Sequence, residues 1–132
     1  MEEIWIDVKD YEGLYQVSNW GRVKSLEREE IHIQYGKQVV RHLKERILIP
    51  RDEGTRHLQV SLCKNGKKEM KHVYRLVAEA FLPNPNNYNA IHHIDRNPLN
   101  NRLENLEWMD RGKHQAMHRM LQIKGEKKHV NF

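Results

Sequence analysis

The histidines in the last third of the chain have the spacing that metal and base chemistry requires. His114 and His118 lie four residues apart, and His92 and His93 are adjacent. Side chains four residues apart share one face of a helix, with Cβ atoms about 5–6 Å apart, so two imidazoles there can bind one divalent cation. Adjacent strand residues point to opposite faces, so His92 or His93 can supply a third ligand. The other imidazole can then act as a base near neutral pH.

The residues around these histidines predict the elements that hold them. A short strand over residues 90–94 is followed by a turn-rich stretch, 95–101, and by a second strand around 106–108. Asp110 is a good N-cap for a helix that runs to about Leu121 and carries the histidine pair. Strand, loop, strand and helix together are more specific than a histidine pair alone, which also occurs by chance.

The preceding residues predict a hairpin, a helix and a β-rich N-terminal part. Residues 58–62 alternate between apolar and polar, Asn65-Gly66 is a hairpin turn, and 69–73 is its second strand. The apolar spacing becomes helical from residue 74 to 82, where Pro83 ends the helix. Residues 1–50 form short strands and turns, with Gly36-Lys37 between two strands of a hairpin. The predicted fold class is α+β.

Composition excludes several classes of protein. Hydrophobic residues make up 38% of 132 residues, which is enough for one modest core. The longest apolar runs, such as 47–49, are far shorter than the ~20 residues of a membrane span, and the acidic start of the chain has no secretory signal. A single cysteine, Cys63, excludes an internal disulfide and a zinc site built from cysteines. We expect a soluble protein of a reducing compartment with no membrane partner.

The charge is unevenly distributed along the chain. The formal net charge is +5, yet residues 1–50 carry 8 Lys and Arg against 9 Asp and Glu, so all the excess positive charge lies beyond residue 50. A basic surface attracts polyanions because counterions are released on binding, which makes nucleic acid the first partner to consider. Solvated lysines that serve only solubility are the alternative.

A longer pattern around the histidines resembles the HNH nuclease signature. The resemblance runs over 93–97, 100–108 and His114, and extends upstream over 76–85. It implies a ββα-metal (His-Me finger) motif over about 90–121, in which two short strands and a helix surround one divalent cation. The three signature residues fall on His93, Asn105 and His114.

The N-terminal residues resemble a second known module. Residues 3–5, 11–19 and 21–26 are similar to the NUMOD-type module, which accompanies HNH nucleases in homing and phage endonucleases and is associated there with DNA binding. The resemblance implies a NUMOD-type β-rich module over 1–50 and an HNH nuclease domain over 51–132. We expect Trp5, Trp20 and Tyr15 to serve the core of this small module.

The HNH resemblance also implies a role for each candidate residue. His93 takes the position of the general base that activates water, and Asn105 orients this base and its loop through hydrogen bonds. His92, His114 and His118 take the positions of metal ligands. Candidate DNA-binding residues are Arg75, Arg96 and Arg102, each of which could also be an ordinary surface arginine. Relatives often have Gly where Arg96 stands, so the sequence does not decide which turn this loop forms.

The expected function is that of a metal-dependent DNA endonuclease with a one-metal mechanism, acting in the cytoplasm of a bacterial or phage-infected cell. The cofactor is one divalent ion, magnesium, manganese, nickel or zinc. One active centre cuts one strand, so a double-strand break needs a homodimer or two nicks, and the sequence indicates no other protein partner. The alternatives are a non-catalytic DNA-binding protein with a structural zinc site and, below it, an RNA-directed nuclease.

Overall fold

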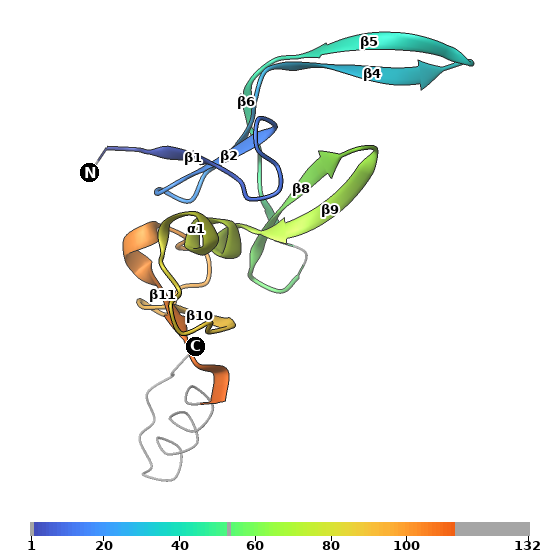
Figure 1. Ribbon diagram of the computed structural model, residues 1–132. Helices are drawn as coiled ribbons and strands as arrows, with labels where there is room; N and C mark the ends of the chain where they lie inside the picture. Colours follow the sequence, from blue (N-terminus) through green and yellow to red (C-terminus); the bar gives the residue numbers. More distant parts are fainter. Residues whose placement is uncertain (1, 53, 113–132) are drawn as a thin grey trace, which may run out of the picture.

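The structure is a computed structural model that describes residues 2–52 and 54–112 (Figure 1). His114, His118 and nearly all of the predicted C-terminal helix lie outside the described residues. The described chain is rich in short antiparallel strands and has one α-helix among its assigned elements. This arrangement confirms the predicted α+β class.

The N-terminal module is built on a four-stranded antiparallel sheet. Its strands are, in spatial order, β1 (Trp5–Asp7), β2 (Tyr15–Ser18), β3 (Val23–Ser25) and β6 (Arg46–Ile47). Val17 and Val23 face each other across β2 and β3 and are buried, because alternate residues of a strand share one face. The predicted short strands of residues 1–50 are therefore present, and their apolar positions contribute to the core.

A long two-stranded ribbon is inserted between β3 and β6. Its strands are β4 (Arg28–Gln34) and β5 (Lys37–Leu43), which among the described strands pair only with each other. The sequence predicts this hairpin but places its turn one residue too late. The turn residues are Tyr35 and Gly36, with φ values of 53° and 74°, as a two-residue turn with both central φ angles positive requires.

A three-stranded sheet follows the N-terminal module. It contains β7 (Arg51–Asp52), β8 (Leu58–Lys64) and β9 (Lys67–His72). Asn65 and Gly66 form the turn between β8 and β9 with φ values of 53° and 75°, as the sequence predicts. Val60 and Leu62 on β8 are buried and face the rest of the core.

Helix α1 (Val73–Phe81) covers the core between the two halves of the chain. Its Val73, Leu76 and Val77 are buried, which agrees with the helical apolar spacing of the sequence. The helix ends at Phe81 and is capped by Leu82, just before Pro83. The indole Nε1 of Trp108 donates a hydrogen bond of 3.0 Å to the backbone oxygen of Leu82, which ties this helix end to the last strand.

The last described elements are a strand pair and the start of a helix. Strands β10 (Ala90–His93) and β11 (Leu106–Met109) are antiparallel, and the 3-10 turn η1 (Leu103–Asn105) leads into β11. Residues 111–112 are helical, and the backbone N–H of Gly112 donates to Oδ1 of Asp110 at 2.8 Å. Asp110 is therefore the helix cap that the sequence predicts.

One continuous core joins the N-terminal module to the rest of the chain. Buried side chains from β2, β8, α1 and β11 belong to a single cluster, and the Tyr15 hydroxyl accepts a hydrogen bond of 2.9 Å from the backbone N–H of Cys63. Tyr15 is in the core as expected. Trp20 is 36% exposed and lies under the guanidinium of Arg102, so its predicted place in the core is wrong.

Within residues 2–52 and 54–112 no helix is long and apolar enough to span a membrane.

Candidate active site

Strands β10 and β11 place the two adjacent histidines on opposite faces. His92 pairs with Glu107 and His93 with Leu106 in the antiparallel register. Their exposed fractions are 8% and 5%, so both imidazoles are buried although they point in opposite directions. The geometry therefore allows one histidine to bind a metal ion and the other to act as a base, which is the division of tasks that the sequence predicts.

His93 is held by an asparagine that the sequence did not single out. Its ring Nε2 lies 3.0 Å from Oδ1 of Asn101, which is itself 5% exposed. When Nε2 carries the proton and donates it to this oxygen, the lone pair of the neutral ring is on Nδ1. Burial lowers the pKa of His93 below its usual value of 6.5, and the hydrogen bond to Asn101 opposes this only in part. The ring is thus neutral, as a base must be, at neutral pH.

Two further rings contact His93, and a third ring contacts those two. The ring centroids of Tyr74 and His57 lie 5.3 Å and 6.2 Å from that of His93. His72 stacks on Tyr74 at 5.1 Å and contacts His57 at 6.0 Å. Burial lowers the pKa of His72 as well, with the neighbouring His57 as the next cause. These residues, 57, 72, 74 and 93, are called the imidazole cluster below.

Sequence reasoning missed His57 and His72, but a signal for them was present. The Asn65-Gly66 turn fixes the register of β8 and β9, in which Gln59 faces His72. His57 lies two residues before Gln59, so the same register places it diagonally opposite His72, and their ring centroids are 6.0 Å apart. The contact of this group with His93 depends on tertiary packing, and no local pattern predicts it.

Asn105 organises the loop between β10 and β11. Its amide oxygen accepts from the backbone N–H of Asp95 at 2.8 Å, and its amide nitrogen donates to Oδ1 of Asp95 at 2.9 Å and to the backbone oxygen of Asn100 at 2.8 Å. Asn100 also donates to Asp95 at 2.8 Å, and this hydrogen bond is the main cause of the lowered pKa of the Asp95 carboxyl. Asn105 contacts the loop in this way, whereas the ring of His93 is contacted by Asn101.

The N-terminal module supports the same loop from outside. The backbone N–H of Leu103 donates to the backbone oxygen of Asn19 at 2.8 Å. A Cβ added to Gly21 would lie 2.9 Å from the backbone oxygen of Asn101, closer than real Cβ atoms come. The residue that holds His93 is therefore packed directly against the N-terminal module, and only glycine fits at the contact.

The predicted metal ligands can be judged only at His92. Within residues 2–52 and 54–112 no group of three His, Cys, Asp or Glu side chains is arranged to hold a metal ion, and His114 and His118 lie outside that range. Nε2 of His92 lies 3.9 Å from Oε1 of Glu107. An imidazole nitrogen beside a carboxylate oxygen is a donor set that suits a divalent cation. His92 and Glu107 supply two such donors, of which Glu107 is a neighbour that the sequence did not suggest, and the metal centre stays a prediction.

The three candidate arginines lie at different places around the site. Arg96 follows β10 in the Asp95 loop, has a φ of 64°, and donates its backbone N–H to the oxygen of His93 at 2.9 Å. Arg75 on α1 donates to the backbone oxygen of Asn89 at 3.2 Å, and Arg102 pairs with Glu104 at 3.0 Å. The three arginines lie on different elements, and their role as phosphate contacts stays a prediction.

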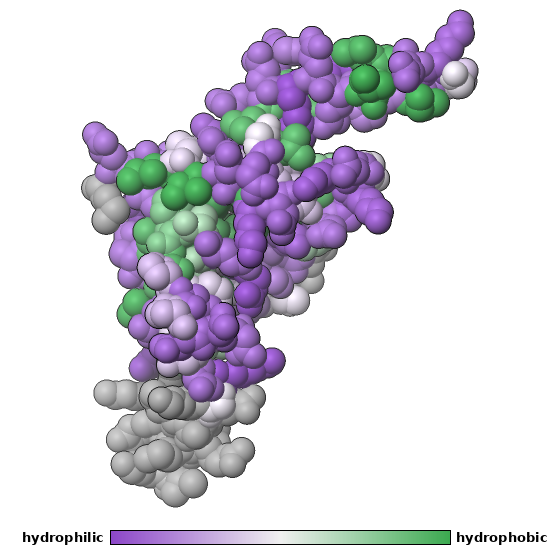
Figure 2. Space-filling view, in the orientation of Figure 1, coloured by the Kyte–Doolittle hydropathy of each residue, from purple (hydrophilic) through white to green (hydrophobic). Residues whose placement is uncertain are grey.

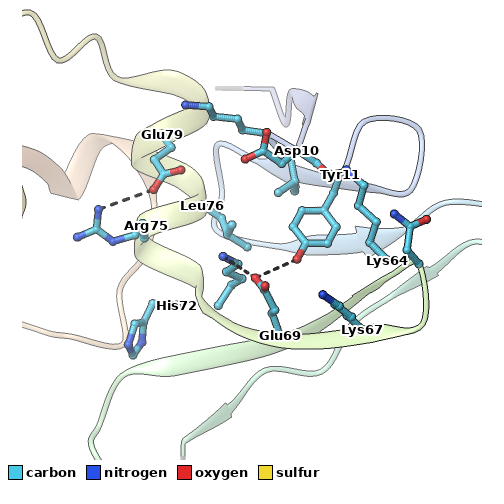
Figure 3. Close-up of a pocket in the computed structure, with 13 residues that line it drawn as sticks. Asp10, Tyr11, Lys64, Lys67, Glu69, His72, Arg75, Leu76 and Glu79 are labelled. Carbon is cyan, nitrogen blue, oxygen red and sulfur yellow. Dashed lines mark hydrogen bonds and ion pairs between the residues drawn. The ribbon is translucent and has the colours of Figure 1, made fainter.

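A basic cleft opens on the other side of His72 (Figure 3). It has a volume of about 430 Å³ and is walled by β9, α1 and the loop after β1. Its cations outnumber its carboxylates and are Lys9, Lys64, Lys67, Lys71 and Arg75. Glu69, at its centre, accepts from Lys71 at 3.0 Å, the main cause of its lowered pKa, and from the Tyr11 hydroxyl at 3.3 Å. Neither His92 nor His93 lines the cleft, which meets the imidazole cluster through His72.

The strand pair, its asparagine-bonded loop and the helix that starts after Asp110 form the described part of a ββα unit with a histidine pair on its first strand. Residues 71–116 match the family model described as HNH endonuclease, and residues 3–71 match the NUMOD4 motif. The chain belongs to the HNH endonuclease family and carries an N-terminal NUMOD4 module. The two matches meet at residue 71, and the predicted domain boundary at residue 50 stays a prediction.

Individual relatives agree with this membership. The chain is 39% identical over 105 residues to the DNA endonuclease I-HmuI of Bacillus phage SP01, which covers 80% of this chain and 51% of that protein. It is 48% identical over 58 residues to an uncharacterised HNH endonuclease of Acanthamoeba polyphaga mimivirus, which covers 44% of this chain and 17% of the viral protein. The chain therefore spans about half or less of these curated relatives.

The fold matches a solved structure as well. A solved structure described as DNA binding and cleavage by the HNH homing endonuclease I-HmuI is similar to this chain, with a TM-score of 0.66 and 29% sequence identity. The match covers 97% of this chain and 62% of the solved chain. The match therefore includes the N-terminal module as well as the strand pair that carries the histidines.

Proposed function

We propose that this protein is a metal-dependent DNA endonuclease that hydrolyses phosphodiester bonds with His93 as the general base. The observation that carries the proposal is the position of His93, which is buried on β10, hydrogen-bonded to Asn101 and adjacent to His92 on the opposite face. A relative of similar fold is described as binding and cleaving DNA, which supports DNA as the substrate.

The chain's own residues divide the work. His93 removes the proton from the water that attacks phosphorus, and Asn101 holds the ring so that Nδ1 can accept this proton. Asn105 keeps the loop behind the base rigid through Asp95 and Asn100. The basic side chains around the site bind the phosphates on either side of the scissile bond. The products are 5′-phosphate and 3′-hydroxyl ends.

The residues that would hold the cation are His92 on β10 and, by family resemblance, His114 and His118. When bound, a divalent cation stabilises the negative charge that builds on the phosphate oxygens and on the departing O3′. The carboxylate of Glu107, 3.9 Å from His92, would add negative charge beside this ligand.

Cleavage of supercoiled plasmid tests the proposal directly. The parent chain is incubated with magnesium, manganese, nickel or zinc, with and without chelator, beside the His93→Ala variant. We expect nicked or linear DNA with at least one ion, no cleavage with chelator, and a loss of at least about 100-fold for His93→Ala. His93→Ala should still bind DNA and metal. Cleavage by this variant at the parental rate would exclude His93 as the base.

The same preparation distinguishes the proposed endonuclease from a DNA-binding protein with a structural zinc site. In that case no ion would support cleavage, and chelator would unfold the chain because metal binding and folding would be coupled. A buried imidazole base beside the ligand position has no use in such a site, which is why cleavage is the favoured function.

A further inference from the structure

The hydrogen bond that holds His93 leaves one rotation of its ring open. The contact between its Nε2 and Oδ1 of Asn101, at 3.0 Å, fixes the position of one ring atom. The torsion that turns a histidine ring has broad minima, so a ring held at one atom can still swing about it. Loss of alignment by about 1 Å can lower a rate about 100-fold. A second restraint, on the plane of the ring, would therefore keep Nδ1 aimed at the reacting water.

Two neighbouring rings supply such a restraint. The ring of Tyr74 stands at 75° to that of His93 with 5.3 Å between centroids, and the ring of His57 lies at 35° and 6.2 Å. Edge-to-face contact at such a distance is a favoured arrangement of aromatic rings. His57 and Tyr74 also contact each other at 5.5 Å, so the three rings form a closed triangle. His57 and Tyr74, called the ring clamp below, therefore oppose rotation of the His93 ring.

The ring clamp is anchored in the body of the molecule. Tyr74 packs against the core from the first turn of α1, next to the buried Val73. Its ring stacks on that of His72 at 5.1 Å and 20°, which holds it from β9. His57 precedes β8, whose Leu58 also packs against the core. The visible surface over β8 and β9 is mostly hydrophilic (Figure 2), so the clamp is not part of an exposed apolar patch there.

The side chains of the ring clamp are stiff. A planar ring moves as one body, so its contacts persist, whereas an aliphatic side chain in the same space can adopt several rotamers. Nδ1 of His57 is buried and has no hydrogen-bond partner among the described residues, so this nitrogen makes no hydrogen bond to His93. The contact between the two histidines is therefore one of ring against ring. Stiff neighbours of this kind are what a precisely oriented catalytic group requires.

We propose that His57 and Tyr74 are positioning residues for the general base, whose rings fix the plane of the His93 imidazole while Asn101 fixes its tautomer. The proposal deepens the proposed function and rests on it. Neither ring touches the substrate or exchanges a proton in this role, because both act through His93. When the plane of the base is fixed in advance, Nδ1 is already aimed as the water and the scissile phosphate arrive, and less ordering is left for the transition state.

Paired substitutions in the full chain test whether the rings themselves are needed. Tyr74→Phe and His57→Phe keep an aromatic ring, whereas Tyr74→Leu and His57→Leu remove it and keep an apolar side chain. The matched control is Tyr88→Leu, which removes another half-buried tyrosine, in the loop after α1, whose backbone is hydrogen-bonded to Asn84. The values of kcat and KM for plasmid nicking are measured with the most active of the four metals, well below the thermal midpoint of each variant.

We expect both leucine variants to lose kcat roughly 10–100-fold with KM changed less than about twofold, since the rings act on the base alone. Both phenylalanine variants should keep kcat within about threefold, because the ring contacts remain. His57→Phe should not lower the thermal midpoint, since it removes a buried nitrogen that has no hydrogen-bond partner among the described residues. The Tyr88→Leu control should nick plasmid as the parent does.

Nuclear magnetic resonance of the metal-free chain gives a readout besides activity. With isotope-labelled histidine, the nitrogen shifts of His93 report its tautomer, and the relaxation of its ring carbons reports how ordered the ring is. We expect Tyr74→Leu to lower the order of the His93 ring while Nε2 stays protonated. Asn101→Ala should also change the tautomer. A loss of general stability alone would move neither signal at a temperature where the variant is fully folded.

Two results would overturn the role of the ring clamp and leave the proposed function intact. One is nicking at the parental rate by both leucine variants, whatever the order of the His93 ring. The other is an equal loss of kcat in the phenylalanine and leucine variants, which would mean that the Tyr74 hydroxyl or a nitrogen of His57 acts directly. A parent chain that cuts no DNA with any of the four metals would instead overturn the proposed function and, with it, any role of the ring clamp in catalysis.

Discussion

At the scale of single residues, the site depends on how one imidazole is oriented. A general base acts only when its lone pair is aimed at the reacting proton, and its neighbours set this orientation. For His93 that neighbour is Asn101, whose Oδ1 lies 3.0 Å from Nε2. The signature asparagine, Asn105, acts one step further out, on the loop. Two asparagines four residues apart thus have different tasks, which spacing alone did not separate.

Asn101→Ala tests this assignment. Loss of the hydrogen bond lets the ring of His93 rotate, so we expect kcat for plasmid nicking to fall about 10–100-fold. DNA affinity, measured with chelator present, should change less than about twofold, because Asn101 is buried and contacts no substrate. The control is Asn86→Ala, which changes an exposed asparagine in the loop after α1. An equal loss of affinity and kcat would contradict a positioning role.

Replacement of Arg96 should change two separate quantities, the stability of the chain and its affinity for DNA. Its φ of 64° places it in the left-handed region, where Gly is at ease and Arg is not. We expect Arg96→Gly to raise the free energy of unfolding by about 0.5–1 kcal/mol, since relief of strain exceeds the added entropy of the unfolded chain. If the side chain binds phosphate, DNA affinity should fall and the salt slope should decrease by about 0.9.

Chemical denaturation and binding at several salt concentrations measure both effects of Arg96→Gly. Arg56→Gly is a matched control for stability, because Arg56 has a φ of 62° and is exposed. Both variants should become more stable. Unchanged DNA affinity and salt slope in Arg96→Gly would remove Arg96 from the candidate phosphate contacts.

At the scale of elements, the sequence predicted what is local and missed what packing decides. Apolar periodicity and the Asn65-Gly66 turn gave the β8–β9 hairpin and α1, because both depend on nearby residues. The ribbon turn was placed one residue late, since Tyr35 is an unusual residue for its conformation. Trp20 was expected in the core, yet its indole lies on the surface with arginines over its faces. Large apolar residues in a small module do not all fit inside it.

In the candidate site, too, the sequence predicted the residues set by local spacing and missed those brought together by packing. His92 and His93 were found from spacing on one strand, but the imidazole cluster comes from β8, β9, α1 and β10. Such a group is visible in sequence only after the register of two hairpin strands and their packing on a third element are known. The predicted ligands His114 and His118 lie outside the described residues, so the metal centre stays a prediction.

The contact between the N-terminal module and the Asp95 loop yields a prediction at this scale. Gly21→Ala places a Cβ 2.9 Å from the backbone oxygen of Asn101 at a φ of 87°. We expect a loss of about 2–4 kcal/mol in the free energy of unfolding, part from the backbone conformation and part from the contact. Nicking activity should also fall, because Asn101 must shift to make room and His93 loses its support.

Gly13→Ala separates the two causes of this loss. Gly13 has a φ of 79°, but a Cβ there would meet nothing within 4 Å. Gly13→Ala should therefore cost only the conformational part, about 1–2 kcal/mol, and should leave nicking unchanged when measured well below the unfolding transition. Equal effects of the two variants on stability and on nicking would show that the close contact with Asn101 has no consequence.

At the scale of the whole molecule, the two modules share one interior. Val17 and Val23 of the N-terminal sheet belong to the same buried cluster as Leu62, Val77 and Leu106. The Tyr15 hydroxyl accepts a hydrogen bond from the backbone N–H of Cys63 on β8, and the backbone oxygen of Asn19 accepts one from the backbone N–H of Leu103 in the loop before β11. The N-terminal sheet is therefore part of the folding unit that holds the site.

This shared core predicts how a truncated chain behaves. A fragment of residues 51–132 would expose the apolar faces of β8 and α1 that Tyr15 and Val17 cover, and a chain of that length has little other core. We expect the fragment to show no cooperative thermal transition by circular dichroism and no nicking, and the full chain to unfold in a single transition. Addition of a separate 1–50 fragment should restore part of the signal, since the missing surface would be supplied. A fragment 51–132 that unfolds cooperatively and cuts plasmid would show instead that the boundary predicted at residue 50 separates two independent domains.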